Sequence, residues 1–200
     1  MLKRFFLWIG TVCIAAFIIF TAEAVLSQRA LADKTLRLHI VANSDTPRDQ
    51  EQKIRLRDHI LGEIRDMALD CSDLESAERA IKRELPRLRE SAKDFLVKDG
   101  SHYDVSVTLC TETFGTRQYD TFSLPAGEYH ALRIVIGEGM GKNWWCVVFP
   151  TLCNATDPEE LERMAEEGGY AEGELAFIRR EDTKYKLQFK VLEWFKKVFN

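Results

Sequence analysis

The sequence has no excess of positive charge and few of the residues that build metal or nucleophilic centres. Lysine and arginine total 28 against 32 aspartates and glutamates, which gives a net charge of −4. A nucleic-acid-binding protein would show a basic footprint, and none is present. The 4 histidines are scattered, without a His-x-x-x-His or Cys-x-x-Cys spacing. We therefore expect no metal, no cofactor and no nucleic-acid partner.

Internal repeats, low-complexity tracts and catalytic motifs are also missing from the 200 residues. The length fits one domain with appendages. No motif joins a nucleophile to a base, so we assign no catalytic residues and expect no enzyme. Two alternatives stay open: Cys146 as a nucleophile with His130 or His39 as its base, and a serine triad that assembles only in space. A thiol in an apolar strand is usually inert.

The chain opens with a long uncharged stretch. Lys3 and Arg4 precede the apolar run Phe5–Phe20, and Ala22-Glu23-Ala24 matches a small-x-small cleavage pattern. We expect residues 1–24 to be a signal peptide that is cleaved after Ala24. The alternative is an uncleaved anchor, because the uncharged run is just long enough to span a bilayer. In both cases the rest of the chain crosses the membrane.

The part of the chain after the signal peptide would be exported, and export affects how its cysteines are interpreted. Residues 25–35 would form a linker, and residues 36–200 a single domain. Disulfides persist in oxidising compartments. Cys146 and Cys153 enclose six residues that include Phe149-Pro150, where the chain can turn back. We predict a disulfide between them, with two buried thiols as the alternative.

Hydrophobic periodicity predicts an α+β fold. Alternation with a period of two indicates strands at 36–43, 103–110, 117–122 and 129–136. Residues 144–149 are apolar on both faces, which predicts a buried central strand. Helical stripes follow Thr46-Pro47, Ser72-Asp73 and Asp157-Pro158, the second kinked or split at Pro86. We expect a mostly antiparallel sheet of about five strands, with two long helices on one face and an amphipathic C-terminal helix at 186–199.

The segment 137–153 (GEGMGKNWWCVVFPTLC) concentrates glycine, tryptophan and cysteine. Its glycines and Lys142 look like a phosphate loop, but Asn143 and a strand follow where Ser or Thr and a helix are required. We prefer a glycine-rich contact loop, with a mobile hairpin loop as the plain alternative. Trp144 and Trp145 face opposite sides of a strand, so either both are core residues or one is held out for a partner.

Polar residues after the first strand complete the candidate site. Asn43 and Asp45 either satisfy turn and cap donors or contact a partner directly. The basic amphipathic helix at 186–199 either lies on a membrane or docks on the sheet. The candidate partner-binding residues are Gly137, Glu138, Gly139, Gly141, Lys142, Asn143, Trp144, Trp145, Asn43 and Asp45.

Three stretches of this sequence resemble the stage II sporulation protein R family. They are LRLHIVANSDTPRDQEQKIRLRD (36–58), FGTRQYDTFSLPAGEYHALRIVIGEGMGKNWWCVVFPTLC (114–153) and FKVLEW (189–194). The block from 124 to 153 is highly specific, whereas the helices at 73–98 and 157–168 are generic. The family signature maps onto Asn43, Ser44, Asp45, Gly137, Gly139, Gly141, Trp144, Trp145, Cys146 and Cys153, as structural or contact positions and not as catalytic ones.

The resemblance implies a secreted signalling protein of endospore-forming bacteria. Such a protein is made in the forespore and exported into the space between forespore and mother cell. There it would activate a membrane-embedded aspartyl protease through the extracytoplasmic region of that protease, which then cleaves a mother-cell pro-sigma factor. Two rival functions remain: a cell-envelope hydrolase, and a membrane-anchored structural protein of the envelope.

Overall fold

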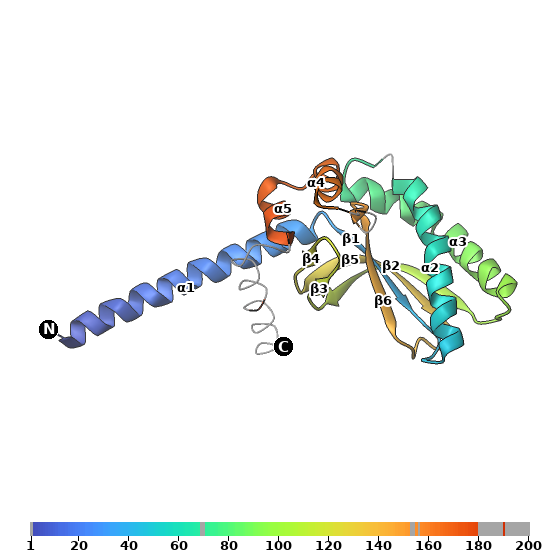
Figure 1. Cartoon of the computed structure of the whole chain (residues 1–200), viewed down its shortest axis with the longest axis horizontal. Coiled ribbons are helices and arrows are strands. Elements are labelled where there is room, and N and C mark those ends of the chain that lie inside the picture. The colour runs from blue at the N-terminus through green and yellow to red at the C-terminus, as the bar shows by residue number, and fades with distance from the viewer. Residues whose placement is uncertain (1, 69–70, 153–154, 156, 180–189, 191–200) are drawn as a thin grey trace.

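A mixed four-stranded sheet forms the centre of the molecule (Figure 1). The computed structural model describes residues 2–68, 71–152, 155, 157–179 and 190. The strand order is β2-β5-β1-β6, from β2 (Val105–Phe114) through β5 (Gly127–Ile136) and β1 (Leu36–Val41) to β6 (Asn143–Phe149). The β1–β5 pair is parallel, and the two outer pairs are antiparallel.

The α+β class is confirmed, but the expected sheet is wrong in three details: its strand directions, the strand at 117–122 and the place of β6. The sheet is mixed because β1 and β5 are neighbours in space and not along the chain, with two helices and three other strands between them. Turn lengths report only on consecutive strands, so they could not reveal this parallel pair. The weak strand expected at 117–122 instead contributes to a separate ribbon of β3 (Arg117–Gln118) and β4 (Ser123–Leu124).

Strand β6 was expected in the centre of the sheet but lies at its edge. Its two apolar faces have different coverings. Trp144, Cys146 and Val148 face the core under the long helices. Val147 belongs to a second apolar cluster, formed with Leu161 and Leu175 of the later helices. An edge strand covered on both faces has the same apolar composition as a central one, so composition alone could not place it.

Helices α2 (Pro47–Ala68) and α3 (Leu74–Lys98) cover one face of the sheet. Helix α2 begins as expected: Pro47 is its first residue, and the Thr46 hydroxyl accepts from the Asp49 amide at 3.3 Å. Helix α3 begins one residue later than expected, because Asp73 is its N-cap and Ser76 completes the capping box. It runs through Pro86 without being split.

Helix α1 (Leu2–Ala32) projects away from the body, and only its last turns pack against it (Figure 1). Ala24 and Leu31 are fully buried there, beside α5 (Glu172–Ile178). Residues 25–32, expected in a linker, continue this helix. It is long and apolar enough to cross a membrane, and signal sequences share this length and composition. Helix α4 (Pro158–Glu167) precedes α5, and the expected C-terminal helix lies outside the described residues except for residue 190.

Candidate functional site

We call the loop between β5 and β6, residues 137–142, the distal loop. It lies at the end of the sheet opposite α1, because β1 starts beside α1 and ends beside this loop. Every backbone amide of the loop has an acceptor. The amides of Gly137, Gly139, Met140 and Gly141 donate to the backbone carbonyls of Asp104, Ile136, Asn43 and Ala42 respectively, at 2.8 to 3.1 Å.

The two remaining amides of the distal loop use side-chain acceptors. The Glu138 amide donates to Asn43 Oδ1 at 3.0 Å, and the Lys142 amide donates to Asp45 Oδ1 at 2.7 Å. A phosphate cradle needs amides that are free to point at the anion. With every amide of the loop already bonded to the protein, the glycine segment is not a phosphate site. Asn43 and Asp45 brace this loop across the fold.

The three glycines of the loop are required by its geometry. Gly137 and Gly139 have φ angles of +56° and +63°, a region that favours glycine. A Cβ atom on Gly141 would lie 2.3 Å from the carbonyl oxygen of Ser44. The loop can therefore approach the turn after β1 only without side chains at these positions.

Asp49 holds the turn after β1 in place from the first turn of α2. Its Oδ2 accepts from Asn43 Nδ2 at 2.9 Å and from Ser44 Oγ at 2.6 Å. Burial raises the pKa of Asp49, but these hydrogen bonds, with others from Tyr103 and Thr46, outweigh it, and the net pKa is lowered. The ionised carboxylate is thus the form that organises the turn.

Lys53 connects α2 directly to the distal loop. Its Nζ donates to the Lys142 carbonyl at 2.8 Å and to Gln50 Oε1 at 2.7 Å. The side chain is buried, and burial lowers the pKa of this amine. Donors from α2 and acceptors from the turn after β1 therefore fix the loop from two sides.

Met140 is the exposed tip of this fixed loop. Its side chain is 81% exposed. Among the described residues outside α1, the other large apolar side chains that are exposed are Val97 and Tyr103. Val97 lies in the last turn of α3 and Tyr103 just before β2, whose first residue pairs with the last residue of β5. The exposed apolar groups of the folded body thus gather at its distal end.

Trp144 and Trp145 are both half-buried and both pack against other side chains. Trp144 faces the main core, and the Arg57 guanidinium lies 4.9 Å from its ring centroid. Trp145 faces the opposite side of the sheet between two groups: the Arg117 guanidinium at 3.5 Å and the stacked His39 ring at 5.7 Å. Neither tryptophan is held out in the way that Met140 is.

The second face of the sheet is polar but buried at its centre. His39 is fixed at both ring nitrogens, with Glu112 Oε2 and Asn143 Oδ1 each at 2.8 Å. Arg37 is fully buried, with its guanidinium 3.9 Å from the Phe114 ring centroid. His39 is therefore committed to structural partners and is not a base beside Cys146, which faces the other side of the strand.

The predicted disulfide between Cys146 and Cys153 stays a prediction. Cys146 is buried in the main core, and Cys153 lies outside the described residues. Cys71 and Cys110 are free. Burial raises the pKa of the Cys110 thiol, with a further contribution from Glu112, so this thiol is a weak nucleophile.

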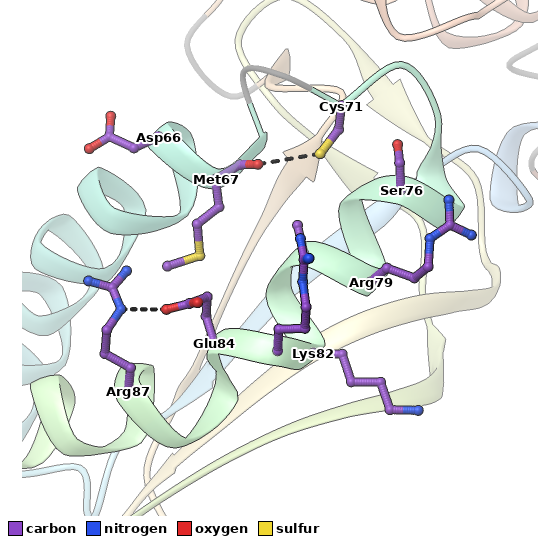
Figure 2. Close-up of a pocket in the computed structure, with 10 residues that line it drawn as sticks. Asp66, Met67, Cys71, Ser76, Arg79, Lys82, Glu84 and Arg87 are labelled. Atoms are coloured by element: carbon purple, nitrogen blue, oxygen red, sulfur yellow. Dashed lines mark hydrogen bonds and ion pairs between the residues drawn. The ribbon is translucent and has the colours of Figure 1, made fainter.

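A hollow with a volume of about 940 Å³ lies between the end of α2 and the start of α3 (Figure 2). Long charged side chains of α3 dominate its lining, among them Arg79, Lys82 and Arg87. The Cys71 thiol at its edge donates to the Met67 carbonyl at 3.3 Å, and no histidine lines the hollow. Its described lining residues thus offer no nucleophile–base pair.

Sequence reasoning missed Met140, Asp49 and Lys53. Met140 was not predicted because the glycines and tryptophans around it carry the stronger sequence signal. A single apolar residue between glycines in an otherwise polar loop was the available signal. Asp49 and Lys53 lie in a charged helix whose pattern gives no sign that both turn inward, Asp49 to hold the turn after β1 and Lys53 to hold the distal loop.

Comparison with known proteins assigns the chain. The family described as "Stage II sporulation protein R (spore_II_R)" matches residues 32–159. The stage II sporulation protein R of Bacillus subtilis (strain 168) is 41% identical over 123 residues, which are 62% of this chain and 55% of that protein. The chain thus spans about half the length of this curated relative. No solved structure gives a significant match. The matched region contains β1, the distal loop and the turn that braces it, and the chain belongs to the stage II sporulation protein R family.

Proposed function

We propose that this protein is an exported sporulation signal that activates a membrane-embedded aspartyl protease by binding its extracytoplasmic region. Cleavage of a mother-cell pro-sigma factor by that protease would follow. The protein would act between the forespore and mother-cell membranes. Its role would be binding and not catalysis.

The observation that carries the proposal is the distal loop. A loop whose amides are all bonded pays little entropy when a partner binds. It presents Met140, a flexible and polarizable side chain suited to apolar pockets. The membership of the family and the apolar helix α1 support a sporulation role outside the cytoplasm.

The position of the loop also suits a signal that acts across a gap. Helix α1 enters one end of the body, and the distal loop, which carries Met140, lies at the other end of the sheet (Figure 1). A chain held or delivered at one membrane through α1 would direct the distal loop away from that membrane. A receptor in the facing membrane could then be reached.

A pull-down tests this proposal. The immobilised extracytoplasmic region of the protease should retain the wild-type chain and retain Met140→Gln at least about tenfold less, as expected for a central contact residue. Glu128→Gln is the matched control, since it introduces the same side chain at the exposed opposite end of β5. Equal retention of the wild type and Met140→Gln would remove the loop from the interface.

A further inference from the structure

The outer edge of the sheet at β2 carries backbone groups that no described strand pairs with. Strand β2 is terminal in the sheet and pairs only with β5. The Gly137 amide donates to the Asp104 carbonyl, so the groups of Asp104 point toward β5. The Val105 carbonyl accepts from Arg89 Nε at 3.1 Å and points outward. By alternation, the amides and carbonyls of Val107, Leu109, Thr111 and Thr113 also point outward.

This edge lacks the protection usual in natural sheets. Exposed edge strands are commonly short, bulged, or marked by lysine or proline. Strand β2 spans 10 residues, VSVTLCTETF, with no lysine, arginine or proline, and its register with β5 is continuous. The other edge strand, β6, is shorter at 7 residues, and its register shifts beside Leu36. The β2 edge is therefore the open one.

A groove runs beside this edge, under α3. It has a volume of about 510 Å³ and is lined by Leu85, Pro86, Arg89, Glu90, Lys93 and Val107. A strand added to β2 would project alternate side chains to the helix side of the sheet, into this groove. Leu85, Pro86 and Val107 offer apolar contact there.

The rim of the groove carries more positive than negative charge. Arg89 is engaged at one end, by the Val105 carbonyl and by Asp104 at 3.6 Å. Lys93 has no ion-pair or hydrogen-bond partner in the described chain, and Glu90 is the one carboxylate in the lining. A carboxylate entering beside Lys93 would gain an unshared cation.

We propose that the β2 edge and the α3 groove form a peptide-binding site that accepts an extended segment of a partner protein as an additional strand. Main-chain hydrogen bonds to the outward groups of β2 provide affinity, and the groove selects side chains. The segment places apolar residues along the groove with an acidic residue opposite Lys93. This site lies at the other edge of the sheet from β6 and does not depend on the proposed role of the distal loop.

Synthetic peptides and amide hydrogen exchange test the site on the full chain in detergent micelles. The probe is Thr-Val-Thr-Glu-Thr-Val-Thr, and its counterpart has lysine in place of glutamate. The glutamate peptide should slow exchange at Val107, Leu109, Thr111 and Thr113 by at least about tenfold. It should bind more tightly than the lysine peptide.

Two variants isolate the two parts of the site. Thr111→Pro removes an outward backbone amide and leaves the hydrogen bonds between β2 and β5 in place. It should weaken peptide binding by about tenfold or more. Lys93→Glu should reverse the preference between the two peptides. Lys98→Glu makes the same charge change on α3 outside the groove and should keep the wild-type preference.

Three outcomes would overturn the proposal. The first is unchanged exchange of the outward β2 amides at saturating peptide. The second is peptide preference unaltered by Lys93→Glu. The third is sedimentation showing a dimer that Thr111→Pro dissociates, because the edge would then serve a second copy of this chain. None of these results bears on binding through Met140, so this proposal and the proposed function can fail separately.

Discussion

Single glycines decide whether the distal loop can lie against the turn after β1. Gly141→Ala would place a Cβ atom 2.3 Å from the backbone oxygen of Ser44. Because a backbone atom cannot swing aside, the loop must shift and lose hydrogen bonds. We expect the free energy of unfolding to fall by about 1–3 kcal/mol, as for other overpacked sites. Urea denaturation of the purified chain measures this change.

Gly62→Ala is the matched control for that substitution. Gly62 lies within α2 and would meet nothing within 4 Å of an added Cβ. Alanine is a better helix former than glycine by about 1 kcal/mol, so this variant should be more stable than wild type. If both alanine variants changed stability equally, the steric account of the distal loop would be wrong.

The pH dependence of stability should report on Asp49. Its folded-state pKa lies below the ordinary value of 3.8, so its stabilising contribution is present above about pH 4 and is lost as pH falls through the folded pKa. Asp49→Asn should destabilise the chain by about 2 kcal/mol at pH 7. The difference between wild type and variant should shrink below pH 4. A difference that stays constant from pH 7 to pH 3 would contradict this role.

At the scale of elements, local sequence patterns predicted where helices and strands lie in the chain. They did not predict which strands lie next to each other in the sheet. Thr46-Pro47 predicted the start of α2 because capping depends on adjacent residues. The parallel pairing of β1 with β5 depends on contacts between distant segments, which no local pattern records. The edge position of β6 was missed for the same reason.

The sequence predicted the residues of the candidate site but not the hydrogen bonds that join them. Asn43 and Asp45 were recognised as turn formers, and the distal glycines as unusual. Their bonds to one another, such as Asn43 Oδ1 to the Glu138 amide, join positions far apart in the sequence. Glycine content alone does not distinguish a mobile loop from one fixed by its neighbours.

The predicted disulfide would join β6 to the segment that follows it. We expect Cys146 and Cys153 to be joined in the exported protein, and reduction to lower stability by roughly 2 kcal/mol. Alkylation without reduction, followed by mass spectrometry, should modify Cys110, which is exposed and free, and leave the pair unmodified. Alkylated Cys153 in the unfolded, unreduced chain would disprove the link and reopen the case for a Cys146 nucleophile.

At the scale of the whole molecule, an apolar helix and an exposed contact loop occupy opposite ends of the folded body. If the leader is cleaved after Ala24, the rest of α1, from Val25 to Ala32, stays with the body and keeps Leu31 in the second apolar cluster. The arrangement of sheet, braced loop and exposed Met140 therefore does not depend on whether the leader is removed.

The central claim is that Met140, on its braced loop, delivers the signal. Its most direct test is pro-sigma factor cleavage in sporulating cells that carry Met140→Glu. We predict that the variant is exported and folded at wild-type levels, as shown by immunoblotting and resistance to protease, while cleavage of the pro-sigma factor falls at least about tenfold. Cleavage at the wild-type rate by a folded, exported Met140→Glu protein would contradict the account.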